Sequence, residues 1–198
     1  MANCGVEQAG EGWSVKARPW KPTWAETAQD PPDAAPSRLA SRADRALVPG
    51  DPFLKQATGD SYPSYRTPGQ RTAIRTVLGT EPGSTVLTIL PTGSGKSAVM
   101  SVPAYFAKPD VSVIVVPTTS LALDLASRLE ATYVLDHQLA YHGGLGTTER
   151  DAIRQRLRNC EQWLVVTSPE SACNSLEPTL TSIAGQGRLR YLMIDEAH

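Results

Sequence analysis

The sequence predicts an α/β fold with a mainly parallel sheet, preceded by an irregular, proline-rich segment. From residue 61 onward, short apolar runs alternate with amphipathic stretches, the pattern of strands joined by helical crossovers. Phosphate-binding and acidic motifs follow two of these runs, where parallel strands place their ligand-binding loops. The expected domains are therefore residues 1–60, a tail or linker, and residues 61–198, a single core.

The first segment is expected to lack regular structure, because prolines interrupt it and its other residues show no apolar periodicity. These prolines stand at positions 19, 22, 31, 32, 36, 49 and 52. Residues 51–59 are the first candidate for ordered structure, since Phe53 and Leu54 form the first adjacent apolar pair there.

Four runs rich in β-branched residues predict strands buried on both faces. They span residues 84–90, 111–116, 162–168 and 189–195, and a weaker strand is expected at 137–141. Three stretches carry apolar residues at three- and four-residue spacing and predict helices at 96–106, 119–130 and 148–158. Pro103 is expected to kink or split the first helix.

The run PTGSGKS joins the first strand to the first helix. Gly93 and Gly95 allow positive φ and close approach of phosphate to backbone N–H groups, and the helix adds its positive N-terminal end. Lys96 is expected to contact the β and γ phosphates, and the Ser97 hydroxyl to ligate Mg²⁺. Leu90 stands where the general pattern has glycine, and a chance glycine-rich turn is the alternative. The predicted phosphate-binding residues are Pro91, Thr92, Gly93, Ser94, Gly95, Lys96 and Ser97.

An acidic pair follows the last predicted strand. Asp195 is expected to hold Mg²⁺ opposite Ser97, and Glu196 to polarise the attacking water. Alone, the pair would more often be a solvated turn, but together with Lys96 it predicts nucleotide hydrolysis.

PTGSGKS followed by DEAH at residues 195–198 resembles motifs I and II of superfamily 2 helicases, whose proline-first loop accounts for Leu90. YRTPGQRTAI, residues 65–74, resembles the adenine-reading segment of RecQ-type helicases. The resemblance implies a RecA-like P-loop NTPase lobe that uses ATP and Mg²⁺, with Gln70 on adenine and Arg66 or Tyr65 beside the ring. Alternatively, Gln70 only caps its own helix, in a T-x-x-Q capping box.

Two further segments resemble the strand-gripping motifs of these helicases and imply single-stranded or forked DNA as the partner. VPTTSL, residues 116–121, offers Thr118, Thr119 and Ser120, and VVTSPES, residues 165–171, offers Thr167, Ser168 and Glu170. Both could instead be simple helix N-caps. YHGGLGTTER, residues 141–150, resembles a short DNA-contacting turn, for which a glycine-rich connector is the stronger alternative. The resemblance gives His198 a coupling role between ATP and DNA.

The resemblance implies part of an ATP-dependent 3′-to-5′ DNA helicase or translocase. The chain is expected to be an N-terminal fragment, truncated at motif II and weak in hydrolysis alone, because it carries no second lobe with arginine fingers. Within RecQ-like proteins it looks most like the DpdF subfamily of bacterial clusters that place deazaguanine bases in DNA. Alternatives are an RNA helicase or double-stranded-DNA translocase fragment, and a binding module without turnover.

Composition excludes other classes. The net charge of −1 gives no overall attraction to polyanions, so nucleic-acid contacts must be local. Three separated cysteines without a C-x-x-C pair argue against a disulfide framework or a zinc site. The beginning has no signal-peptide pattern and no apolar run has membrane-spanning length, so a cytoplasmic protein without membrane contact is expected.

Overall fold

The computed structural model describes residues 6–9, 12–15 and 47–196. The chain divides into two compact units, residues 1–43 and residues 44–198. In the first unit, β1 (Val6–Ala9) pairs antiparallel with β2 (Gly12–Val15), so that Val6 lies opposite Val15. This hairpin differs from the irregular structure expected there, because both strands precede Pro19, the first proline of the sequence.

The second unit begins with elements that lie ahead of the predicted boundary at residue 61. The strands β3 (Val48–Pro49) and β4 (Ser64–Tyr65) pair antiparallel around α2 (Pro52–Thr58). Leu54 and Ala57 of α2 are buried against α3 (Pro68–Gly79) and α4 (Lys96–Phe106), in a cluster that also contains Ile74 and Val102. Burial of these apolar side chains extends the ordered core to residues that precede the predicted boundary.

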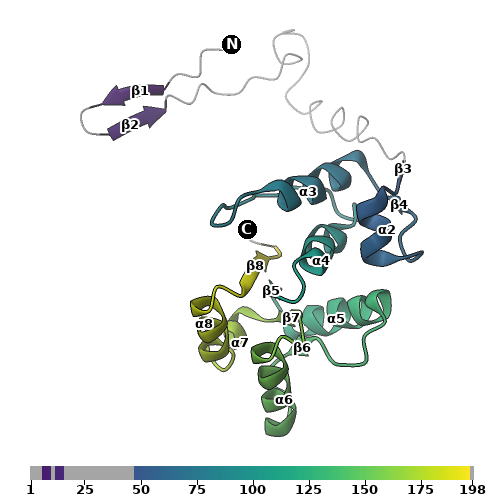
Figure 1. Ribbon diagram of the computed structural model, residues 1–198, viewed down its shortest axis with the longest axis vertical. Helices are drawn as coiled ribbons and strands as arrows, with labels where there is room; N and C mark the ends of the chain where they lie inside the picture. The colour runs from purple at the N-terminus through teal and green to yellow at the C-terminus, as the bar shows by residue number, and fades with distance from the viewer. Residues whose placement is uncertain (1–5, 10–11, 16–46, 197–198) are drawn as a thin grey trace, which may run out of the picture. The chain divides into compact units, whose positions relative to one another are not determined.

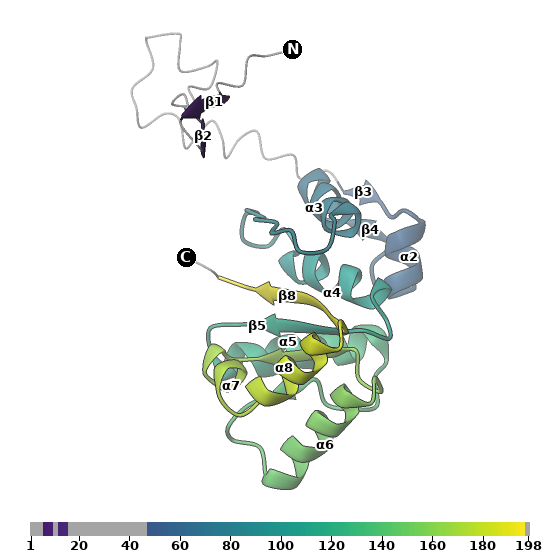
Figure 2. The same cartoon turned by 60° about the vertical axis from the view of Figure 1, so that its left-hand side comes forward.

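The centre of this unit is a four-stranded parallel sheet in the order β6-β7-β5-β8 (Figures 1 and 2). Its strands are β6 (Ala140–Tyr141), β7 (Leu164–Thr167), β5 (Val111–Val115) and β8 (Leu189–Ile194). The remaining helices are α5 (Thr119–Tyr133), α6 (Thr147–Arg158), α7 (Pro169–Cys173) and α8 (Glu177–Gly185). The predicted α/β fold with a parallel sheet is confirmed.

Helices cover the sheet on both faces, because successive side chains of a strand point to opposite sides. Ile114 of β5 packs with Leu125 of α5 in one core cluster. Val113 of the same strand packs with Ile153 of α6 and Ile183 of α8 in another. Both faces of β5 are therefore buried, as its continuous apolar sequence predicts.

Two expectations for the segment around α4 differ from the structure. Residues 84–90 form no strand, and no described strand pairs with them; they belong to the loop between α3 and α4 (Figure 2). A strand needs a hydrogen-bonded neighbour, and without one Leu87 and Ile89 are 80% and 85% exposed. Helix α4 is not split at Pro103, which stands only three residues before its end.

No helix among residues 6–9, 12–15 and 47–196 combines the length and the apolar character that crossing a bilayer would require.

Candidate functional site

The glycine-rich turn before α4 has the backbone geometry expected of a phosphate loop. Gly93 and Gly95 have φ angles of 81° and 83°, which side-chain-bearing residues adopt only under strain. Between them, Ser94 is buried and donates both its backbone N–H and its hydroxyl to the Pro91 carbonyl, at 3.2 and 2.6 Å. Helix α4 begins at Lys96, so the first N–H groups of the helix lie next to the turn.

The acidic pair lies beside this turn. Asp195 follows β8, and its backbone N–H donates to the Val115 carbonyl of β5 at 2.9 Å. Glu196 has a φ of 53°, and its N–H donates to Asp195 Oδ1 at 3.0 Å. The Lys96 ammonium lies 3.4 Å from Glu196 Oε1. The structure thus brings the phosphate loop and the acidic strand end to one place, 100 positions apart in the sequence.

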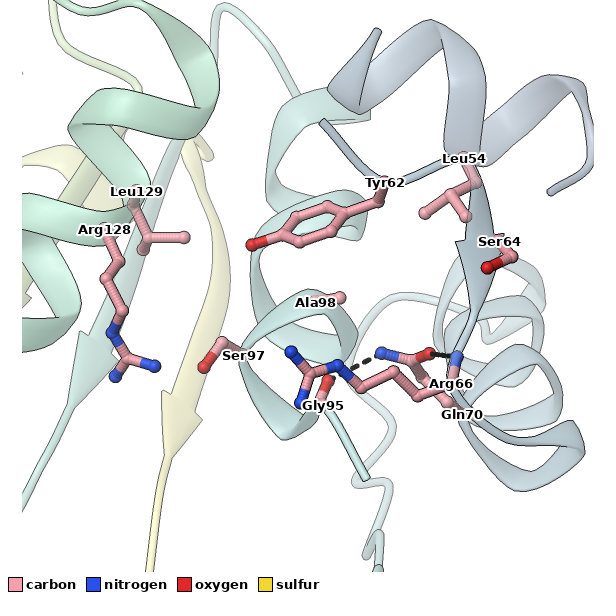
Figure 3. Close-up of a pocket in the computed structure, with 10 residues that line it drawn as sticks. All are labelled: Leu54, Tyr62, Ser64, Arg66, Gln70, Gly95, Ser97, Ala98, Arg128 and Leu129. Carbon is pink, nitrogen blue, oxygen red and sulfur yellow. Dashed lines mark hydrogen bonds between the residues drawn. The ribbon is translucent and has the colours of Figure 1, made fainter. Parts of the chain in front are cut away.

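Gln70 joins helix α3 to the phosphate loop. Its side-chain oxygen accepts from the Arg66 backbone N–H at 2.7 Å, and its Nε2 donates to the Gly95 carbonyl at 2.8 Å (Figure 3). Its own backbone N–H donates to Thr67 Oγ1 at 3.0 Å, which is half of a capping box. Only the Thr67 half of the capping box is present, because the Gln70 carboxamide bonds to the Arg66 N–H and the Gly95 carbonyl instead of to the Thr67 N–H.

Arg66 is exposed, and its Nη1 donates to the Gly93 carbonyl at 3.2 Å. Tyr65 cannot flank a base, contrary to one expectation, because its side chain is fully buried and its hydroxyl donates to Asp51 Oδ1 at 2.6 Å. Successive side chains of an extended segment point to opposite sides. Tyr65 therefore faces the core while the next residue, Arg66, is exposed.

Sequence reasoning missed Tyr62, whose ring extends across the pocket in Figure 3. Its hydroxyl lies 3.4 Å from Thr132 Oγ1 of α5. The sequence offered one signal for it, since Tyr62 is the other tyrosine of the same segment, but its partial burial is seen only in the structure. Which of the two tyrosines faces the pocket depends on strand geometry, which the sequence pattern alone did not specify.

A pocket of about 90 Å³ lies in front of α4 (Figure 3). It is smaller than the roughly 300–1,000 Å³ of sites that enclose a ligand, so a nucleotide here would remain partly exposed. Arg66, Gln70, Gly95 and Ser97 line one part of it, beside the phosphate loop. The remaining lining residues are Leu54, Tyr62, Ser64, Ala98, Arg128 and Leu129.

The residue types fit magnesium with ATP. A hydroxyl at Ser97 and a carboxylate at Asp195 are oxygen ligands, and Mg²⁺ usually completes its shell with phosphate oxygens and water. Within the described part of the chain, no three His, Cys, Asp or Glu side chains gather as a metal centre. A magnesium ion would accordingly depend on the phosphates of a nucleotide as well as on the protein.

The predicted nucleic-acid contacts lie at the same carboxyl edge of the sheet. Thr118 is exposed and caps α5, accepting from the Leu121 N–H at 3.3 Å, and Ser120 is exposed one residue into the helix. Because Val115 pairs with Thr167, the segments after β5 and β7 emerge side by side. This arrangement follows from parallel pairing, as the sequence pattern predicts.

In the other predicted segment, residues 165–171, fewer side chains are available to a nucleic acid than expected. Thr167 is fully buried and its hydroxyl donates to the Tyr141 carbonyl at 2.8 Å, so its side chain is not available to a ligand. Ser168 is also buried and caps α7, accepting from the Ser171 N–H at 3.4 Å. Glu170 is exposed. His142 acts as a turn residue, since its Nδ1 accepts from the Gly144 N–H at 3.2 Å. His198 lies outside the described residues.

Comparison with known proteins agrees with this geometry. The DEAD/DEAH box helicase family matches residues 67–198. The ATP-dependent DNA helicase Q5 of Rattus norvegicus is 34% identical over 152 residues, which are 73% of this chain and 14% of that protein. The ATP-dependent DNA helicase Q4 of Mus musculus is 29% identical over 143 residues, 69% of this chain and 11% of that protein. The chain thus spans about one seventh or less of these two relatives.

A solved structure, the DUF1998 helicase MrfA bound to DNA and AMPPNP, superposes with a TM-score of 0.58 at 21% identity, covering 76% of this chain and 22% of that one. This likeness supports the RecA-like α/β fold. The helicases Q5 and Q4 confirm the predicted RecQ-like resemblance. The DpdF subfamily assignment stays a prediction. The chain belongs to the DEAD/DEAH box helicase family.

Proposed function

We propose that this chain is the ATP-binding portion of an ATP-dependent 3′-to-5′ DNA helicase or translocase, with residues 61–198 forming part of its first RecA-like lobe. One observation carries the proposal: Lys96 Nζ lies 3.4 Å from Glu196 Oε1, so the phosphate-loop cation and the strand-end acid occupy one site. In a nucleotide hydrolase these groups act on the same phosphate and its attacking water.

The roles follow from the chemistry of each side chain. Lys96 exchanges Glu196 for the β and γ phosphates when nucleotide enters. Ser97 and Asp195 would hold the magnesium that comes with ATP, and such an ion would neutralise charge on the phosphate oxygens. Glu196, separated from Lys96, accepts the proton of the attacking water. Backbone N–H groups of the turn and of the first residues of α4 bind the phosphate oxygens, except that of Ser94, which donates to the Pro91 carbonyl.

The base side of the site is formed by Arg66, Gln70 and Tyr62. Arg66 and Tyr62 line the pocket with groups that stack on an aromatic base. Gln70 has one amide hydrogen beyond its bond to Gly95, and it can exchange its present partners for the adenine edge. Adenine reading by Gln70 therefore requires a small rearrangement of its contact with the phosphate loop.

DNA is proposed as the partner because the relatives Q5 and Q4 are named DNA helicases and MrfA was solved with DNA. Thr118, Thr119 and Ser120 are exposed hydroxyls suited to a strand phosphate, and Glu170 lies in the first turn of the neighbouring helix α7. Thr167 and Ser168 contribute through the fold of that loop, since their hydroxyls bond within the chain.

The test is the ATP hydrolysis rate of the protein in its full encoded length, with single-stranded DNA, double-stranded DNA or RNA at equal nucleotide concentration. Single-stranded DNA should stimulate most, and a duplex with a 3′ tail should be unwound faster than one with a 5′ tail. Stimulation of ATP hydrolysis by RNA alone would indicate an RNA helicase instead. Undiminished ATP hydrolysis by a Lys96→Ala variant would contradict the proposed nucleotide site.

A further inference from the structure

Asp51 lies at the centre of a polar cluster in which its own carboxylate is buried and the side chains of Arg71 and Arg75 are 42% and 48% exposed. Its carboxylate is 9% exposed and accepts from the Leu54 backbone N–H at 3.1 Å and from the Tyr65 hydroxyl at 2.6 Å. Arg75 donates to it through Nε at 3.1 Å and Nη2 at 2.8 Å. Arg71 Nε lies 3.7 Å away. These contacts join the start of α2, strand β4 and helix α3 at one carboxylate.

The cluster connects to the phosphate loop through two short paths. Tyr65 directly precedes Arg66, whose side chain donates to the Gly93 carbonyl and whose backbone N–H donates to Gln70. Arg75 lies on the same helix as Gln70, which donates to the Gly95 carbonyl. Asp51 thus holds both segments whose side chains contact the two positive-φ glycines of the loop.

The hydrogen-bond partners of Asp51 keep its carboxylate charged. Burial alone would raise its pKa, but the Tyr65 hydroxyl, the Leu54 N–H and Arg75 outweigh burial and lower it, so the carboxylate is the stable form. An N-cap needs only a side-chain acceptor, which asparagine or serine supplies equally well. Here Oδ2 accepts both bonds from Arg75, while Oδ1 accepts from the Tyr65 hydroxyl and the Leu54 N–H, so both oxygens serve as acceptors. Asparagine offers one acceptor oxygen, and its NH₂ group would face one set of these donors.

We propose that Asp51 is a positioning residue for nucleobase recognition: it fixes Arg66 and Gln70 against the phosphate loop and so sets the affinity for the base of ATP. This inference rests on the proposed function, because it assigns Arg66 and Gln70 to the base side of the site. The phosphate-binding groups at the start of α4 are held by that helix, and Arg66 and Gln70 bond only to carbonyl groups of the loop, so phosphate affinity should depend on Asp51 less than base affinity does.

The experiment compares MgATP with magnesium tripolyphosphate, which has phosphates but no base, by calorimetric titration of the chain and its Asp51→Asn variant. Asparagine keeps the N-cap and the volume but loses the charge that holds Arg75. MgATP should bind the variant about tenfold more weakly, and tripolyphosphate less than about twofold more weakly. Tyr65→Phe removes one hydrogen bond to Asp51 and should also weaken MgATP binding more than tripolyphosphate binding, but to a smaller extent. This variant replaces Asp51→Asn in the experiment if Asp51→Asn does not fold.

A double-mutant cycle separates positioning from a purely structural role. In a Gln70→Ala background, Asp51→Asn should lose most of its effect on MgATP affinity, because residues that act through one another are not additive. Equal weakening of MgATP and tripolyphosphate, or an effect unchanged in the Gln70→Ala background, would overturn the inference and leave the proposed function standing. If the unaltered chain binds neither ligand, the proposed function fails and this inference fails with it.

Discussion

Gly93 and Gly95 share a left-handed backbone but differ in their surroundings. Their φ angles are 81° and 83°. A Cβ added at Gly93 meets nothing within 4 Å, whereas one at Gly95 collides with Gln70 Nε2 and comes within 3.2 Å of Arg66 Cδ. An alanine would therefore strain the backbone at both positions, but only at Gly95 would it also displace Gln70.

Gly95→Ala should lower the free energy of unfolding by about 1–2 kcal/mol more than Gly93→Ala. Both variants bear the strain of an alanine at positive φ, but only the first displaces Gln70 from its hydrogen bonds. Urea denaturation of both variants without nucleotide measures the difference. Equal losses would mean that the bond between Gln70 and the loop contributes nothing to stability.

Asp51 should also make the free energy of unfolding depend on pH in the acidic range. Its pKa is lowered in the folded state, so its contribution is present above the unfolded pKa of about 3.9 and is lost as pH falls through the lower folded pKa. The free energy of unfolding should decline less steeply below about pH 4 in Asp51→Asn than in the unaltered chain. Asp60→Asn, an exposed carboxylate outside the cluster, is the control and should keep the original slope.

Among the elements, β8 has an unusual position. It pairs with β5 on one side and with no described strand on the other, and Leu192 and Ile194 are 59% and 61% exposed. The sequence predicts a strand buried on both faces here, but burial depends on neighbours that no local pattern contains. An apolar sheet edge with unpaired backbone groups favours pairing with another chain.

The chain should therefore self-associate at high concentration, and Leu192→Lys should reduce this, since a charge on an edge strand opposes pairing. Sedimentation velocity over a concentration series measures the effect. Val134→Lys is the control, because Val134 is 89% exposed at the end of α5, on the connection to β6 at the opposite edge of the sheet from β8. If both substitutions act alike, exposed apolar area rather than the edge is responsible.

The starts of the three expected helices were predictable because they depend on local residues. The start of α5 at Thr119 depends on the local cap by Thr118, and the prediction of residue 119 is correct. Its end lies at Tyr133 rather than at residue 130, because Tyr133 stacks on Tyr105 with ring centroids 5.6 Å apart, a contact between distant segments. The missing strand at 84–90 and the choice of Tyr62 over Tyr65 likewise depend on tertiary neighbours.

At the scale of the whole molecule, parallel pairing explains why distant motifs meet. Residues after β5, β7 and β8 share one edge of the sheet, and helix α4 presents its first turn to the same edge through Lys96. The apolar runs correctly predicted the strands before three of these segments, whereas the run at 84–90, expected to form a strand that leads into the phosphate loop, forms none, so the loop reaches this edge through helix α4. The runs were also not enough to show that Thr167 is buried or that Gln70 is already bonded to the loop.

The central claim is that Lys96 and the acid pair at 195–196 form one nucleotide site, and calorimetric titration of the chain with MgATP tests it most directly. The unaltered chain should give saturable heat with a stoichiometry of one. Lys96→Ala should bind at least about tenfold more weakly, since it lacks the cation that meets the β and γ phosphates. A well-folded chain that gives no heat, or one whose affinity is unchanged by Lys96→Ala, would contradict the account.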